Sequence, residues 1–368
     1  MATISYDVRR FAVPVAAMLL LSACSGGEES PRATQTSSAA PTTSAPTTSA
    51  PSEPSPTASP TESGTTETAE PETAPKPYPV SLPAYFEREP DGGDLRLGTV
   101  RERTAAYTSY DASYRSGHLR VTGVLNVPTG KGPFPAVVLA HGYIDPAYYV
   151  SGQGMTRERG YLATQGFVAF HVDYRNHAGS DDDPLADRRL RTGYALDVVN
   201  AVQALRRTPQ VPVDDDRIGL FGRSMGGGVV YKALEIAPGL VGAATAWASV
   251  SSREDENFDH FIREDGDRDP LVDFVEQEYG LPGQAGSAKF WREISARTYF
   301  DRITEPVLLV HGTSDSTCPP AWARASYRAL RAADVDARLA WYPDEHAFGP
   351  SFFAAMARTT GFFRSELG

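Results

Sequence analysis

The stretch Ile218-Gly-Leu-Phe-Gly-Arg-Ser-Met-Gly-Gly-Gly228 decides the fold of this chain. Its first half is apolar, which is typical of a buried strand, and a helical pattern follows over 227–237. Between the two stands a G-x-S-x-G motif centred on Ser224. A serine on so sharp a turn has a strained backbone, and its neighbours must lack Cβ atoms for strand and helix to approach. The motif therefore predicts that the Ser224 hydroxyl stands clear of a sheet at a helix N-terminus; an incidental serine in a glycine-rich turn is the alternative.

Apolar runs and helical patterns alternate on both sides of this stretch. Short apolar runs typical of parallel strands lie at 136–140, 166–174, 241–249, 306–311 and 337–342. Helical patterns lie at 155–165, 187–207, 322–333 and 351–364. Three β-rich pieces between Leu95 and Pro128 suit antiparallel strands. The alternation predicts an α/β fold with a mostly parallel central sheet flanked by helices. It breaks over 251–300, which we interpret as a small cap insert at the carboxyl edge of the sheet.

The N-terminal residues differ from this domain in composition. Arg9 and Arg10 precede a short apolar run that ends in Leu-Ser-Ala-Cys24, which resembles a bacterial lipoprotein signal. We expect residues 1–23 to be the signal peptide and Cys24 to carry the lipid; an ordinary secretory signal is the alternative. Residues 24–79 are dominated by Ser, Thr, Pro, Ala and Glu, which predicts a disordered tether. Residues 80–368 then form the folded domain, exported and anchored to the outer face of the cell membrane.

Charge and cysteine content exclude several classes of protein. The 368 residues carry a net charge of −11 without a basic stripe, which argues against a nucleic-acid partner. The two cysteines are Cys24 and Cys318. Once Cys24 is acylated, no disulfide within the chain is expected, so the domain must depend on its hydrophobic core.

A serine hydroxyl is a weak nucleophile until a base takes its proton, and that base needs an orienting carboxylate. In proteins with this motif the nucleophile comes first in the chain, the acid second and the histidine third. The base must therefore be one of the three histidines that follow Ser224. His346 lies in a polar loop between the last predicted strand and helix, whereas His311 ends a buried strand and His260 lies in the insert. We therefore predict His346 as the base.

Asp315 is the predicted acid because it directly follows the apolar run at 306–311. A loop aspartate that accepts hydrogen bonds from its own backbone is the alternative reading. Asp344 and Glu345, beside His346, are the fallback. Cys318, in the same loop as Asp315, is interpreted as a small buried apolar residue.

An oxyanion hole requires backbone N–H groups directed at the tetrahedral intermediate. One donor is expected at Met225, directly after the serine. The other is expected at Tyr143, in the His-Gly-Tyr segment that follows the strand at 136–140. His141 is expected to hold that loop, and Arg223 to form an ion pair within the fold rather than to bind substrate.

The ordered motifs HGY (141–143), DYRNHAGSDD (173–182), GRSMGGG (222–228), HGTSDSTCPP (311–320) and DEHAFG (344–349) resemble the α/β-hydrolase superfamily. The resemblance runs from Val121 to the C-terminus and is nearest to prolyl oligopeptidase catalytic domains, dienelactone hydrolases and acetyl xylan esterases. It implies Ser224 as nucleophile, with the acid, base and oxyanion donors as above.

Two differences from these families favour a stand-alone serine esterase as the expected activity. The residues before the first core strand are too few for the propeller of prolyl oligopeptidases, and the nucleophile is not the cysteine of dienelactone hydrolases. The resemblance then implies a small-molecule or saccharide ester substrate, with no metal and no organic cofactor. A peptidase resembling the prolyl oligopeptidase catalytic domain is the runner-up. A non-catalytic surface-binding lipoprotein on a hydrolase scaffold is the alternative from another class.

Overall fold

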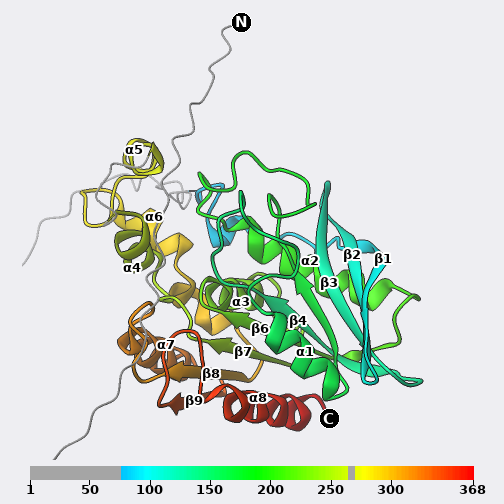
Figure 1. Cartoon of the computed structure of the whole chain (residues 1–368). Helices are drawn as coiled ribbons and strands as arrows, with labels where there is room; N and C mark the ends of the chain where they lie inside the picture. Colours follow the sequence, from blue (N-terminus) through cyan, green and yellow to red (C-terminus); the bar gives the residue numbers. More distant parts are fainter. Residues whose placement is uncertain (1–75, 264–269) are drawn as a thin grey trace, which may run out of the picture. The chain divides into compact units, whose positions relative to one another are not determined.

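A computed structural model describes residues 76–263 and 270–368 of the chain (Figure 1). The chain divides into two units, Met1–Pro71 and Glu72–Gly368, and every described residue belongs to the second. The predicted signal peptide, Cys24 and the predicted tether up to residue 75 lie outside the described residues. Over the part of the chain that is described, no helix combines the length and apolar character needed to cross a membrane.

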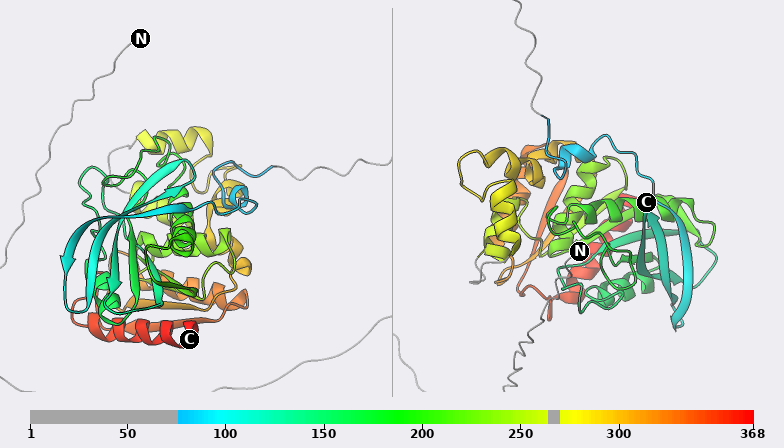
Figure 2. Two further views of the ribbon diagram at one scale, coloured as in Figure 1. Left: turned by 90° about the vertical axis from the view of Figure 1, so that its right-hand side faces the viewer. Right: turned by 90° about the horizontal axis from the view of Figure 1, so that it is seen from above.

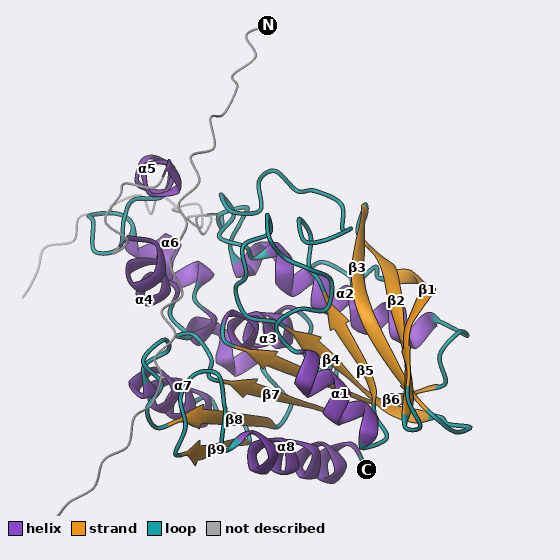
Figure 3. Cartoon of the chain, in the orientation of Figure 1, coloured by secondary structure: helices purple, strands orange, loops and turns teal. Residues whose placement is uncertain are grey.

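A nine-stranded mixed sheet forms the centre of this unit, in the order β1-β2-β3-β5-β4-β6-β7-β8-β9 (Figure 3). The strands are β1 (Gly93–Arg103), β2 (Tyr107–Ser116), β3 (Leu119–Pro128), β4 (Phe134–Ala140), β5 (Val168–Val172), β6 (Val213–Arg223), β7 (Ala243–Trp247), β8 (Val307–Gly312) and β9 (Ala337–Tyr342). Pairing is antiparallel from β1 to β3 and between β3 and β5, and parallel among the remaining strands. Strands β1–β3 form one end of the sheet (Figure 2). The predicted fold class is confirmed.

Helices cover both faces of the sheet. The longer ones are α1 (Thr156–Thr164), α2 (Gly193–Arg207), α3 (Met225–Ile236), α7 (Pro320–Ala332) and α8 (Phe352–Leu367). Helices α2, α3 and α7 contribute to one apolar cluster, and α1 and α8 to a second. Side chains of β4 alternate between the two, with Val138 in the first cluster and Val137 and Leu139 in the second. Successive side chains of a strand point to opposite faces, so the continuous apolar run indicates a strand covered on both sides.

One predicted boundary is wrong: the helix expected over 187–207 begins only at Gly193. Leu190 and Arg191 have φ values of 45° and 56°, in a left-handed region that no α-helix uses. The apolar pattern extends back to Leu190 because that side chain is also buried, but it packs with residues of the cap rather than with the sheet. The spacing of apolar residues indicates that a side chain is buried, but it does not show which part of the protein covers it.

Between β7 and β8 the alternation of strands and helices is interrupted by a run of helical segments, which includes the insert expected at 251–300. It contains α4 (Glu254–Phe258), a π-helical turn (Asp259–Arg263), α5 (Pro270–Glu278), α6 (Ala288–Ile294) and a 3-10 segment (Ala296–Arg302). In Figure 1, α4 and α6 lie on the side toward which the arrowheads of β6 and β7 point. Phe258, Phe290 and Trp291 are buried in an apolar cluster of the cap. These three side chains therefore belong to the core of the insert. The insert also contacts the loop after β8, because Nε2 of His260, in the insert, lies 3.2 Å from the carbonyl oxygen of Thr317 in that loop.

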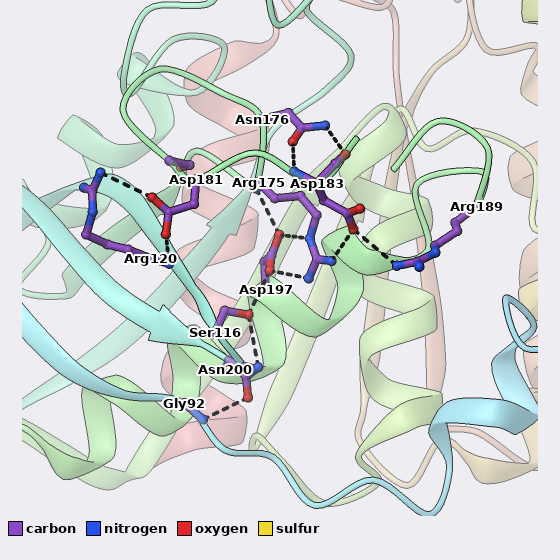
Figure 4. Close-up of polar contacts among 12 residues, drawn as sticks. Gly92, Ser116, Arg120, Arg175, Asn176, Asp181, Asp183, Arg189, Asp197 and Asn200 are labelled. Carbon is purple, nitrogen blue, oxygen red and sulfur yellow. Dashed lines mark hydrogen bonds and ion pairs between the residues drawn. The ribbon is translucent and has the colours of Figure 1, made fainter. Parts of the chain in front are cut away.

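A buried polar network fixes the loop after β5 (Figure 4). The Arg175 guanidinium donates to both carboxylate oxygens of Asp197 on α2, at 2.8 and 3.0 Å, and to Asp183 at 3.0 Å. Asp197 is fully buried and also accepts a hydrogen bond from Ser116 of β2 at 2.8 Å. Asn200 extends the network to the backbone N–H of residue 92. Part of the DYRNHAGSDD motif thus joins β2, α2 and the loop that connects β5 to α2.

Candidate active site

Ser224 occupies the turn between β6 and α3 with φ 58° and ψ −124°, a conformation that residues other than glycine rarely adopt. Its backbone N–H donates to the carbonyl of Trp247 at 2.9 Å. A Cβ atom on Gly222 would lie 2.1 Å from the carbonyl oxygen of Gly226, and one on Gly226 would lie 1.9 Å from that of Ala140. Both positions require glycine, because a side chain at either one would collide with the backbone of another segment. The strained strand–turn–helix that the motif predicts is present.

Asp315 and His346 meet at the carboxyl edge of the sheet. His346 Nδ1 lies 2.9 Å from Asp315 Oδ2, and the Asp315 side chain is fully buried. The other carboxylate oxygen accepts the backbone N–H groups of Thr317 and Cys318 at 3.0 and 2.8 Å. With Nδ1–H donating to the carboxylate, Nε2 of His346 is the nitrogen able to accept a proton. The His346 side chain is 21% exposed, so part of the imidazole is reachable from solvent.

The alternative acid and base candidates have other roles. His311 Nε2 lies 2.9 Å from the carbonyl oxygen of Cys318, and burial lowers the pKa of His311. A neutral His311 therefore supports the loop that carries Asp315. The Asp344 carboxylate accepts backbone N–H groups of Glu345, Gly349 and Ser351, which shapes the approach to α8.

The two residues predicted as oxyanion donors are neighbours of the serine by different routes: Met225 follows it in the chain, and Tyr143 follows Gly142, which lies beside it. A Cβ atom on Gly142 would lie 3.0 Å from Ser224 Cβ and 3.5 Å from its Oγ, so the backbone leading to Tyr143 passes directly beside the hydroxyl. Met225 is the first residue of α3, and N–H groups in the first turn of a helix have no partner within the helix. The Tyr143 ring is 54% exposed, with the Arg191 guanidinium 4.6 Å from its centre.

His141 holds the loop that carries Tyr143. Its ring is fully buried and stacks on Tyr149 with centroids 4.7 Å apart. Nδ1 lies 2.6 Å from the carbonyl oxygen of Gly142. Burial, together with the neighbouring His177, lowers the pKa of His141 to about 4. A ring that stays neutral and enclosed fits the structural role expected from the sequence.

Two nearby side chains have contacts that sequence reasoning described incompletely. Arg223 forms an ion pair with Glu158 of α1 at 3.3 Å, as expected of a residue that pairs within the fold. Glu158 itself was not anticipated, because no motif marks it. Cys318 is buried as expected, and burial raises the pKa of its thiol.

Over residues 76–263 and 270–368, no group of three or more His, Cys, Asp or Glu side chains is arranged to hold a metal ion. The serine on its elbow, the Asp–His pair after later strands and the mixed sheet define an α/β-hydrolase. Residues 155–368 match the model of the prolyl oligopeptidase family, and the chain belongs to that family.

Similar proteins include esterases, a thioesterase and peptidases. Bis(hydroxyethyl) terephthalate hydrolase of Streptomyces coelicolor is 30% identical over 230 residues, which is 60% of this chain and 68% of that protein. Acyl-coenzyme A thioesterase 1 of Rattus norvegicus is 30% identical over 177 residues, covering 48% of this chain and 38% of that protein. Prolyl endopeptidase FAP of Bos taurus is 29% identical over 190 residues, covering 50% and 23%. The chain therefore covers less than two thirds of the thioesterase and of the endopeptidase.

Solved structures show the same fold. Acetyl xylan esterase 1 from Thermoanaerobacterium superposes with a TM-score of 0.58 at 19% identity, covering 77% of this chain and 93% of that one. Acylaminoacyl peptidase of Pyrococcus horikoshii gives a TM-score of 0.56 at 21% identity, covering 72% and 42%. At these identities the likeness establishes the fold alone.

Proposed function

We propose that this protein hydrolyses carboxylic esters through an acyl-enzyme formed on Ser224. The pairing of His346 with the buried Asp315 carboxylate, at the edge of the sheet that carries the strained Ser224 elbow, is the observation that carries the proposal. Asp315 orients the imidazole, and His346 acts as general base and then general acid. The N–H groups of Tyr143 and Met225 stabilise the oxyanion.

The reaction takes two steps. The Ser224 oxygen attacks the ester carbonyl carbon while His346 Nε2 takes the hydroxyl proton. Collapse of the tetrahedral intermediate breaks the bond to the alcohol oxygen, which leaves with the proton from His346. A water molecule, deprotonated by His346, then attacks the acyl carbon and releases the carboxylic acid and the free serine.

Coverage of the similar proteins favours an ester over a peptide substrate. The two ester hydrolases match this chain over 68% and 93% of their own lengths, whereas the two peptidases match over 23% and 42%. Chain segments that the peptidases add have no counterpart in these matches. A small-molecule or saccharide ester is the substrate class that we propose, and peptide hydrolysis is the second candidate, favoured by the family match.

Substrate class is tested with p-nitrophenyl esters of rising acyl length beside aminoacyl p-nitroanilides. We expect the esters to be hydrolysed and the anilides to remain at the level of the blank. The Ser224→Ala variant is the control for contaminating activity. Anilide cleavage without ester turnover would contradict the proposal and favour the peptidase. A folded protein that turns over neither and resists labelling by a fluorophosphonate would favour the non-catalytic alternative.

We further propose that residues 1–23 direct export and that Cys24 carries a lipid that anchors the protein at the outer face of the membrane. The sequence pattern alone supports this. In a bacterial host, the wild-type chain is expected in the membrane fraction and in the detergent phase after phase partition. Cys24→Ala should release it, whereas Cys318→Ala, at the other cysteine, should stay membrane-bound. Recovery of the wild-type protein from the cytoplasm would contradict the proposal.

A further inference from the structure

The loop that carries His346 is held by guanidinium groups from two other parts of the chain. Arg157 of α1 donates from Nη2 to the carbonyl oxygen of Ala347 at 2.8 Å and from Nη1 to that of Phe348 at 3.1 Å. Arg223, directly before the nucleophile, makes a longer contact of 3.4 Å from Nη2 to the carbonyl oxygen of His346 itself. Three consecutive carbonyl groups of the base loop therefore face guanidinium donors.

Glu158 lies between these two arginines. Its Oε1 is 3.3 Å from Arg223 Nη1 and 3.8 Å from Arg157 Nη2. The Glu158 side chain is 1% exposed, so its charge must be balanced by the neighbouring cations. Burial raises the pKa of Glu158, while Arg223, Arg157 and Arg159 lower it. The carboxylate thus pairs with Arg223 and lies within ion-pair distance of Arg157, and both guanidinium groups contact the base loop.

The base loop needs this support because its own backbone is strained. Phe348 has a φ of 53°, in the left-handed region, and its buried ring packs on Trp247 with centroids 4.8 Å apart. Asp315 sets the orientation of the His346 ring through one nitrogen, but it does not set the position of the loop. A displacement of about 1 Å in a catalytic group can lower the rate about 100-fold.

We propose that Glu158 is a positioning residue for the reaction, which fixes the loop of the general base through Arg223 and Arg157. The proposal rests on the role proposed above for His346. It assigns a function to a helix residue that lies in none of the motifs of the site.

The test is a Glu158→Gln variant assayed by steady-state hydrolysis of a p-nitrophenyl ester. We expect kcat to fall about tenfold and KM to change less than about twofold, because the loop shifts while ester binding does not depend on it.

A matched control is Glu235→Gln on α3. Glu235 is also fully buried, and burial raises its pKa well above the usual range, so a neutral glutamine replaces a neutral acid of the same shape. We expect its kcat and KM to match the wild type. Thermal unfolding of each variant shows what fraction of the protein is folded at the assay temperature.

Two further variants keep the proposal testable if Glu158→Gln folds poorly. Arg157 is half exposed, so Arg157→Gln should leave the fold intact and lower kcat about threefold with KM unchanged. In an Arg223→Gln background, Glu158→Gln should add little, because the two residues act as one unit. A kcat for Glu158→Gln equal to that of Glu235→Gln would overturn the proposal, as would a loss of kcat proportional to the unfolded fraction. Ester hydrolysis that survives Ser224→Ala would instead refute the proposed function.

Discussion

Ser224→Ala is expected to lower kcat toward an ester by about 10⁶-fold, and Asp315→Asn by about 10⁴-fold. The first change removes the oxygen that forms the acyl-enzyme. The second keeps the size of the side chain, but it removes the negative charge and changes the hydrogen bonds that the side chain makes. Asparagine would keep its carbonyl oxygen on the N–H groups of Thr317 and Cys318, and its amide would then face His346. An amide donor favours the wrong imidazole tautomer, so Nε2 would no longer accept the serine proton.

Both variants are measured by steady-state hydrolysis of a p-nitrophenyl ester, with thermal unfolding to show that they fold. Asp344→Asn is the matched control, since Asp344 was the fallback acid and its carboxylate accepts backbone N–H groups beside the base loop. We expect that change to cost less than about tenfold in kcat, through the shape of the loop. A larger loss in Asp344→Asn than in Asp315→Asn would mean that the acid is wrongly assigned.

Arg175→Met is expected to lower the free energy of unfolding by about 3–5 kcal/mol. The Arg175 side chain is 10% exposed and Asp197 is fully buried, so removal of the guanidinium leaves a buried carboxylate without its cation. Asp183, which is 12% exposed, loses a partner in the same change. Little water is available to either acid, and the cost of an unpaired buried charge exceeds that of the lost packing.

Urea denaturation of the folded unit measures this loss, and Arg115→Met is its control. Arg115 also pairs with two acids, Asp91 at 3.4 Å and Asp94 at 3.0 Å, but all three side chains are at least 42% exposed. Exposed pairs contribute about 0–1 kcal/mol, so that variant should remain close to the wild type. Replacing Asp197 by leucine in the Arg175→Met background should restore part of the loss. Equal destabilisation by Arg115→Met and Arg175→Met would contradict the role of burial.

Much of the fold could be predicted because its elements have strong local signals. The run at 136–140 is apolar throughout because β4 is covered on both faces. The turn at Ser224 can be predicted from its glycines, because glycine is needed where two backbone segments approach this closely. Prediction failed at Leu190, where an apolar side chain continued a helical pattern but packs against the cap. The pattern along the chain shows that a residue is buried and leaves open what covers it.

The chemistry of the site is carried by the sequence itself. The order of Ser224, Asp315 and His346, each placed after a predicted strand, requires no knowledge of distances, because parallel strands bring their carboxyl ends to one edge of a sheet. Family membership follows from the same residues and agrees with the match over 155–368. The N-terminal signal is likewise a property of local sequence, and it stays a prediction.

Only the tertiary structure decided what supports that chemistry. Glu158 of α1 reaches Arg223 beside the nucleophile, and Arg223 reaches the carbonyl of His346, so the chain segments in contact are far apart in sequence. The same holds for Arg175, whose charge is balanced from α2. The pattern of apolar residues along the chain does not predict such ion pairs, because the partner of a buried charge depends on how the helices pack. The sequence by itself determined which residues can react, and the packing of distant elements determined which residues hold them in place.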